Sequence, residues 1–203
     1  MRPPRINYGL AKFALPGQGE SGDHYLISFN PHGVLIAVLD GVGHGEEAAK
    51  AAKAAISILK AHSRESIVQL VEHCHDGLRW TRGVALSLAS IDTTRGMISW
   101  LGVGNIQGVL LRKPPGCDLP AREMLLLRGG VVGSVLPSLR SADIVATDGD
   151  TLVFATDGVR SDFVENLSAM ESPQRMADKI MERYRNEKDD ALVLVARMNA
   201  NRG

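Results

Sequence analysis

Short apolar runs separated by turn residues fill most of the chain, and this pattern predicts β-strands. The clearest runs are residues 24–29 and 34–39, which flank the turn sequence Asn-Pro-His-Gly and predict a hairpin with a more fully buried second strand. Because further runs follow one another at short spacing, we expect mainly antiparallel pairing. The further strands are predicted at residues 83–91, 97–103, 106–112, 123–127, 142–145, 151–156 and 191–198.

Helical patterns interrupt the strands early and late in the chain. Residues 45–62 are rich in alanine and predict one helix, and a second is expected from residue 63 to about residue 75. A helical region is expected after Gly158, and Ser172-Pro173 is a typical cap and first-turn pair for another helix. Antiparallel strands with helices inserted in this way predict an α+β fold, in which two packed sheets carry helices on the outside.

The composition limits the class of protein. The 203 residues suit a single domain spanning residues 1–203, and 44% hydrophobic and 23% charged residues are ordinary for a globular protein. Lys+Arg and Asp+Glu balance at 23 each, which gives no electrostatic reason to expect nucleic acid or an anionic membrane as a partner. No apolar stretch approaches the roughly 20 residues of a membrane span and the N-terminus lacks a signal-peptide pattern, so we expect a cytoplasmic protein.

Two of the buried runs end in a carboxylate followed by glycine, at Asp40-Gly41 and at Asp157-Gly158. A charge at the end of a buried strand is unfavourable by several kcal/mol or more unless it is compensated, and a divalent cation is the usual compensation. Asp-Gly is also a common hairpin turn signal, but both pairs precede predicted helices, which a hairpin does not explain. These two pairs therefore indicate a metal site.

The chain holds two other Asp-Gly pairs, which serve as a comparison. Asp76-Gly77 follows the predicted end of a helix, and Asp148-Gly149 lies between two predicted strands. We interpret both as turns.

Two further acidic positions lie at strand edges, Asp23 before the first predicted strand and Asp189-Asp190 before the last. If the strands are neighbours, these acids meet Asp40 and Asp157 at one rim, where mutual repulsion raises their pKa values unless cations are bound. Hard oxygen ligands favour Mn²⁺ or Mg²⁺ over Zn²⁺, and two such ions serve the hydrolysis of phosphate esters. The sequence leaves open which of Asp189 and Asp190 contacts the metal.

Five short motifs carry a family resemblance, and they occur in the order Gly22-Asp23, Asp40-Gly41-Val42-Gly43-His44-Gly45, Gly102-Val103-Gly104-Asn105, Thr156-Asp157-Gly158 and Lys188-Asp189-Asp190. Together they resemble the PP2C-type metal-dependent serine/threonine phosphatases, in their bacterial SpoIIE/RsbU/RsbX branch. The resemblance implies a four-layer α-β-β-α sandwich with two central antiparallel sheets. It also implies that a metal-activated hydroxide attacks the phosphorus of a phosphorylated serine or threonine.

The resemblance assigns a role to individual residues. Asp40 would bridge two Mn²⁺ or Mg²⁺ ions and Gly41 would offer its carbonyl, while Asp23 would serve the second metal and Asp157 and Asp189 the first. Three further residues would support the metal ligands without contacting the ions themselves, namely Asn105, Gly158 and Asp190.

The sequence does not decide which residue acts as the general acid. Eukaryotic members of the family place a histidine directly after the Asp-Gly pair and use an arginine near the N-terminus for phosphate. Here His44 comes two residues later, and no arginine flanks Asp23. His44 is a candidate to protonate the leaving alkoxide, with the alternative that it only orders the loop at a helix start.

The resemblance also implies a partner. The predicted hairpin begins within about two dozen residues of Met1, which leaves no room for a preceding sensor domain. This stand-alone arrangement resembles the stressosome phosphatases of Gram-positive bacteria, and implies phosphorylated STAS-type regulatory proteins of a stress-response pathway as substrates.

Other functions compete with this prediction. A catalytically silent binding module and a hydrolase of small phosphorylated metabolites are the alternatives; with only 4% aromatic residues, an open site for a protein is favoured over a closed pocket. A cysteine phosphatase is disfavoured because only four residues separate Cys74 from Arg79, where that family has five. His73, Cys74 and His75 suggest zinc, but without distant partners we interpret them as an exposed helix end.

Overall fold

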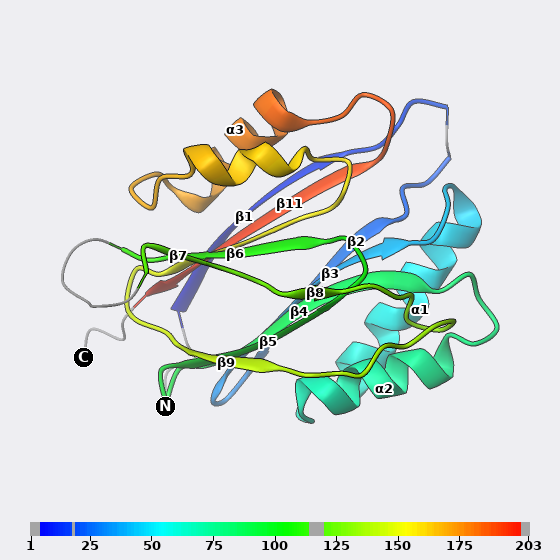
Figure 1. The fold of residues 1–203 in the computed structure, drawn as a ribbon, viewed down its shortest axis with the longest axis horizontal. Coiled ribbons are helices and arrows are strands. Elements are labelled where there is room, and N and C mark those ends of the chain that lie inside the picture. Colours follow the sequence, from blue (N-terminus) through cyan, green and yellow to red (C-terminus); the bar gives the residue numbers. More distant parts are fainter. Residues whose placement is uncertain (1–4, 18, 114–119, 200–203) are drawn as a thin grey trace.

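The computed structural model describes residues 5–17, 19–113 and 120–199 as two β-sheets packed face to face, with helices on both outer faces (Figure 1). The first sheet has the strand order β1-β11-β10-β6-β7, with β1 Arg5–Phe13, β11 Ala191–Asn199, β10 Thr151–Ala155, β6 Gln107–Leu111 and β7 Arg122–Met124. The second has the order β2-β3-β4-β5-β8 with β9 paired to β5, where β2 is Asp23–Asn30, β3 Gly33–Gly41, β4 Val84–Asp92, β5 Met97–Val103, β8 Leu127–Arg128 and β9 Ala142–Val145.

The helices cover one outer face each. Helices α1 (Glu46–Ala61) and α2 (Ile67–Gly77) lie on the second sheet, and α3 (Pro173–Tyr184) lies on the first, beside a 3₁₀ segment at Ser161–Asn166 (Figure 1). The predicted four-layer α-β-β-α sandwich is confirmed. All the strand pairs are antiparallel except β5 with β8.

Burial on both faces explains the uninterrupted apolar run of β3. Val34, Ile36 and Val38 point into the core between the sheets, where they meet side chains such as Phe154 of the first sheet. The residues between them, Leu35, Ala37 and Leu39, pack beneath α1 and α2. A strand buried on both faces carries apolar residues at every position rather than at alternate positions.

Most of the predicted elements are confirmed. The hairpin consists of β2 and β3, and its register places Asp23 opposite Asp40. The second helix starts at Ile67 rather than residue 63, because Ser66 and Gln69 form a capping box that fixes its first turn. Ser172 caps α3, as predicted from the Ser-Pro pair.

Other predictions were wrong in instructive ways. Strand β1 was not predicted: its sequence has no continuous apolar run and Gly9 lies in its middle, and its one partner, β11, is at the other end of the chain. The single strand expected at residues 123–127 is two short strands in different sheets, because the chain crosses between the sheets after Met124. The helical region expected after Gly158, in contrast, is confirmed and is a 3₁₀ segment.

The two comparison Asp-Gly pairs differ from each other. Asp148-Gly149 forms the predicted turn, with a φ of 88° at Gly149, but it connects β9 of the second sheet to β10 of the first. Asp76-Gly77 lies in the last turn of α2, so the prediction of a separate turn was wrong.

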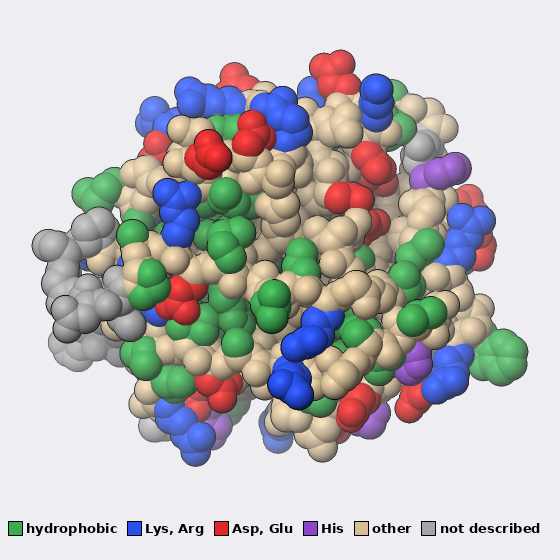
Figure 2. Space-filling model, viewed as in Figure 1, with side chains coloured by type: hydrophobic (Ala, Val, Ile, Leu, Met, Phe, Trp, Pro, Cys, Tyr) green, Lys and Arg blue, Asp and Glu red, His purple; other side chains and the backbone are tan. Residues whose placement is uncertain are grey.

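None of the helices within the described residues is long and apolar enough to cross a bilayer. On the face shown in Figure 2, basic and acidic side chains are interspersed rather than gathered by sign. This arrangement matches the balanced formal charge of the sequence.

Candidate metal centre

Four acidic residues from four strand ends meet at one edge of the two sheets. Asp23 begins β2 and is paired in register with Asp40 near the end of β3. Asp157 follows β10 and Asp189 precedes β11, and these two strands are antiparallel neighbours, so both acids lie at the same end of the first sheet. Each sheet therefore contributes two acids.

A buried hydroxyl joins the two sheets at this edge. Thr156 Oγ1 donates a hydrogen bond to Asp23 Oδ2 at 2.7 Å and accepts one from the backbone N–H of Leu192 at 2.8 Å. Asp23 is only 2% exposed, so this bond fixes the orientation of a carboxylate that water barely reaches. The sequence placed Thr156 in a motif with Asp157 but gave it no role, although its position between a buried strand and Asp157 was a usable signal.

Asp189 and Asp190 are adjacent in the chain but have different surroundings. The buried Asp190 carboxylate accepts hydrogen bonds from the backbone N–H groups of Leu15, at 2.8 Å, and Gly22, at 3.0 Å. Asp190 thereby holds the segment that leads to Asp23. Asp189 is exposed and lines the cleft described below, so the geometry favours Asp189 as the metal ligand and Asp190 as a support.

A cleft of about 590 Å³ opens over the acids. Its lining includes three of the four predicted acidic ligands, Asp40, Asp157 and Asp189, together with the predicted His44 and Asn105. The buried Asp23 is not part of this lining, and lies beside Asp40 in the sheet register.

Two positive side chains near the cleft were missed from the sequence. Lys188 lines the cleft next to Asp189. The Arg82 guanidinium lies against the loop after β3, where a Cβ placed on Gly43 would come within 2.6 Å of its Nη1. Lys188 was visible in its motif, but only the fold shows that it faces the site.

The acids perturb one another. Burial raises the pKa of Asp40 to about 8, and the charges of Asp23 and Asp157 push it in the same direction. Burial raises the pKa of Asp23 to about 7 despite the hydrogen bond from Thr156, which favours the charged form. The pKa of Asp157 is also raised, first by burial and then by Asp189. A cluster with this much repulsion is stabilised by a bound cation.

The donor set fits hard divalent ions. Among the described residues, no three of these acids offer oxygen atoms that all lie within 4.8 Å of one another. The carboxylates are therefore spread more widely than a compact three-ligand cluster. Their oxygen chemistry, rather than their spacing, is what suits Mg²⁺ or Mn²⁺.

Gly41 and Gly158 are needed for close packing around the acids. A Cβ on Gly41 would lie 2.1 Å from the carbonyl oxygen of Ala48 in α1, and a Cβ on Gly158 would lie 1.8 Å from that of Asp190. The sequence argument used the small size of Gly41 to let its own carbonyl reach a metal. The structure adds a separate reason for glycine, and the carbonyl ligand stays a prediction.

Asn105 and His44 differ in their contacts. Asn105 Nδ2 donates a hydrogen bond to Asp157 Oδ2 at 2.6 Å, so it fixes one acid at the cleft. His44 is exposed in the loop before α1 and lines the cleft, with neighbouring Gly43 at a φ of 93°. Its role as general acid stays a prediction.

The cysteine alternative is contradicted by the environment of Cys74. This thiol is buried in α2, and burial raises its pKa to about 12. A nucleophilic cysteine needs a lowered pKa and access to substrate, and Cys74 has neither.

Comparison with known proteins decides the family. The family model described as Stage II sporulation protein E (SpoIIE) matches residues 30–199, which include Asp40, Asp157 and Asp189. The chain belongs to the SpoIIE family. The predicted resemblance to this branch is thereby confirmed.

Relatives of this SpoIIE-family chain cover nearly its whole length. The phosphoserine phosphatase RsbX of Bacillus subtilis is 19% identical over 184 residues, which are 90% of each chain. A solved structure of RsbX in complex with magnesium has a TM-score of 0.84 and 18% identity, over 98% of this chain and 99% of that one.

A second solved structure, described as "The bacterial stressosome: a modular system that has been adapted to control secondary messenger signaling", contains a similar chain. It has a TM-score of 0.84 and 28% identity, over 95% of this chain and 100% of that one. The PP2C phosphatase domain of SpoIIE from Bacillus subtilis has a TM-score of 0.80 and 22% identity, over 100% of this chain and 66% of that one.

Proposed function

We propose that this chain removes phosphate from phosphoserine or phosphothreonine on a bacterial regulatory protein, with two Mn²⁺ or Mg²⁺ ions as cofactors. The observation that carries the proposal is the convergence of Asp23 and Asp40 from one sheet with Asp157 and Asp189 from the other. Their raised pKa values favour a bound cation, and the open cleft above them suits a substrate presented by a protein surface.

The proposed ligands follow from exposure and position. Asp40 would contact both ions, because it lies between buried Asp23 and the cleft that holds Asp157 and Asp189. The Gly41 carbonyl is a further candidate ligand. When bound, such ions polarise the phosphoryl group and lower the pKa of bound water, so that a hydroxide is available at neutral pH.

The other residues of the chain orient the ligands and the substrate. Asn105 holds Asp157 by its amide, and Thr156 holds Asp23 by its hydroxyl. Lys188 is the cation in the cleft, placed to attract the phosphate dianion of the substrate. His44 lines the same cleft and is the candidate to give a proton to the leaving serine oxygen.

The proposed substrates are phosphorylated regulatory proteins of the stressosome type, including STAS-type components. Two comparisons support this class, because the relative RsbX is described as a phosphoserine phosphatase and the structure with the 28% identical chain is described as a bacterial stressosome. The cleft is also bordered by Gly129 and Gly130, whose lack of side chains keeps its mouth open.

A metal-dependent phosphatase assay tests the proposal. The purified chain is incubated with a serine-phosphorylated STAS protein in Mn²⁺, and phosphate release is measured with and without excess EDTA. We expect EDTA to abolish release and added Mn²⁺ to restore it, since the chain offers oxygen ligands at the site. Turnover that persists in EDTA contradicts the proposal. Tight binding of the phosphoprotein without turnover indicates a binding module, and turnover of small phosphate esters alone indicates a metabolite hydrolase.

The stability of the metal-free protein is expected to fall as the pH rises. The pKa values of Asp23, about 7, and Asp40, about 8, lie above their ordinary values, so the folded state favours the protonated carboxyls. That contribution is complete below about pH 4 and is lost as the pH passes through 7 and 8. Thermal melts in EDTA between about pH 5 and pH 9 measure it.

Manganese should reverse this trend, because it compensates the charged carboxylates. The Mn²⁺-induced rise in Tm is therefore expected to be larger at about pH 8.5 than at about pH 5.5. A melting temperature in EDTA that stays level or climbs over this range argues against the raised pKa values.

A further inference from the structure

The junction of α1 and α2 carries a group of side chains that the phosphatase site does not use. His62 follows the last residue of α1, Glu65 precedes the cap of α2, and His73 lies two turns into α2. Each of the three offers a ligand atom, and these atoms all lie within 4.8 Å of one another. Among the described residues, this is the one group of three metal-ligating side chains whose ligand atoms approach one another within this distance.

Glu65 stands between the two histidines. Its Oε1 lies 2.8 Å from His62 Nδ1, and its Oε2 lies 2.7 Å from His73 Nε2. The two imidazole rings are stacked, with centroids 4.1 Å apart and planes 20° apart. The two stacked rings therefore each place one nitrogen against a different oxygen of the same carboxylate.

The backbone around the group is held firmly. The N–H of Glu65 donates to the carbonyl oxygen of His62 at 2.9 Å, which closes the turn between the helices. The capping box of Ser66 then fixes the first turn of α2, and buried Cys74 packs that helix against Ala55 of α1. The backbone positions of the three ligands are therefore preorganised, which reduces the entropy lost on binding.

We propose that His62, Glu65 and His73 bind a transition-metal ion, with Zn²⁺ as the best fit. Two imidazoles and one carboxylate are a common zinc set, and this pair of imidazoles distinguishes the site from the cleft with the predicted carboxylate ligands, which suits Mg²⁺ or Mn²⁺. A fourth position is left for water or another ligand.

The distances suit this ion with a small adjustment. Ligand atoms around a tetrahedral zinc stand roughly 3.3 Å apart, as follows from bond lengths of about 2.0–2.2 Å. The two nitrogen–oxygen pairs, at 2.7 and 2.8 Å, need to open by about half an ångström each, and the stacked rings need to turn so that both nitrogens face one ion. The side chains are 36–44% exposed, so rotamer changes at the surface can supply this movement.

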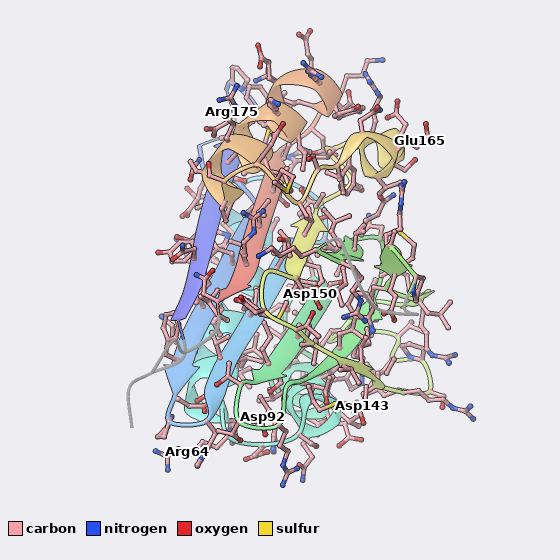
Figure 3. The ribbon with its side chains drawn as sticks, turned by 90° about the vertical axis from the view of Figure 1, so that its left-hand side faces the viewer. Arg64, Asp92, Asp143, Asp150, Glu165 and Arg175 are labelled. Carbon is pink, nitrogen blue, oxygen red and sulfur yellow. The ribbon has the colours of Figure 1, made fainter. Side chains whose placement is uncertain are left out.

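The site lies far from the phosphatase cleft. Helix α1 has 16 residues and separates His44 from His62, a length of about 24 Å along its axis. A second cleft of about 350 Å³, lined by Arg64, Glu65 and Asp92 among others, gives solvent access on this side. Figure 3 shows Arg64 and Asp92 at the end of the molecule opposite Arg175 of α3. A bound ion here would cross-link α1 to α2 without entering the catalytic cleft.

Metal titration of the full chain tests the proposal, with zinc alone as the probe for stoichiometry and cobalt as its spectroscopic substitute. The variants are Glu65→Gln and His73→Ala. The matched control is Glu72→Gln, which changes an exposed acid next to His73 on α2. We expect the wild-type chain and the control to bind one zinc ion more than the two variants, or to bind that ion at least about tenfold more tightly. Loss of even an outer partner of a metal ligand weakens the affinity for the metal by about 10–100-fold.

Cobalt distinguishes this site from the acid cleft. Four-coordinate cobalt with histidine ligands absorbs visible light more strongly than six-coordinate cobalt with oxygen ligands, so the strong band should disappear in both variants and persist in the control. Circular dichroism checks that each variant is folded. If one of the two variants does not fold, His62→Asn removes another ligand and takes its place. Equal zinc stoichiometry, affinity and cobalt spectra across all variants would mean a hydrogen-bonded triad only, and would overturn the proposal.

Discussion

The Asp40→Asn variant is expected to lose about 10³-fold or more in kcat towards a phosphorylated protein substrate. Removal of a single group that stabilises transition-state charge already lowers kcat by about 10²–10³-fold, and Asp40 is proposed to contact both ions. The same change removes a carboxylate that the fold holds with difficulty, since burial and neighbouring charges raise the pKa of Asp40 to about 8. We therefore expect the metal-free variant to melt at a higher temperature than the wild type at about pH 8.5.

These opposite effects make the test sharp. A variant that is inactive because it is misfolded loses both activity and stability, whereas a lost metal ligand lowers activity and raises metal-free stability. Asp76→Asn is the matched control, because Asp76 is also followed by glycine but is exposed on α2 and pairs with Arg79. Full activity of Asp40→Asn, or equal losses in the two variants, would refute the proposed role of Asp40.

The Asp150→Ala variant is expected to lose about 3–5 kcal/mol in free energy of unfolding, because it breaks a buried ion pair. Asp150 Oδ2 lies 2.6 Å from Arg112 Nη1, and their side chains are 1% and 3% exposed. Arg112 also pairs with Glu123 and donates to the carbonyl oxygen of Val145. Asp150 further accepts from the N–H of Thr147 at 2.9 Å, and Figure 3 places it in the middle layers of the molecule.

Urea denaturation of three variants separates the ion pair from general packing. Asp150→Ala leaves the Arg112 guanidinium buried without this partner, while the double variant Arg112→Met with Asp150→Leu removes both charges and is expected to be markedly more stable than Asp150→Ala. The surface variant Asp76→Ala should lie within about 1 kcal/mol of the wild type. A loss below about 1 kcal/mol for Asp150→Ala would show that the buried pair contributes little.

Activity should survive the Asp150→Ala change at temperatures where the variant stays folded. Asp150 precedes β10 and Asp157 follows it, so the ion pair and the acid cluster lie at opposite ends of one strand. Measuring both kcat at about 15 °C and the unfolding midpoint for the variant and the wild type separates an effect on stability from an effect on catalysis.

Local patterns were sufficient for much of the fold. The apolar run of residues 34–39 predicted a buried strand, and the turn before it predicted the hairpin, because burial and turn chemistry act over a few residues. The position of Asp40 and Asp157 at the ends of buried runs marked both as candidates for the same reason. The capped start of α3 was equally readable from Ser172-Pro173.

Long-range pairing was not readable in this way. Strand β1 gains its partner only when β11 arrives from the other end of the chain, and residues 123–127 divide between the sheets because short segments have no strong pattern of their own. The ion pair of Asp150 was not readable either, since its partner Arg112 lies 38 positions earlier in the chain, directly after β6.

The sequence by itself thus determined most of the strand–helix order, the candidate acids and the family resemblance, because these depend on residue type and local spacing. Only the tertiary structure decided that the Asp190 carboxylate accepts hydrogen bonds from backbone N–H groups while Asp189 lines the cleft. It also decided that the Thr156 hydroxyl of one sheet binds Asp23 of the other. It likewise gave His73 the partners that its own helix lacked. Such choices depend on hydrogen bonds between residues remote in the chain, and these are established only when the two sheets and their helices pack.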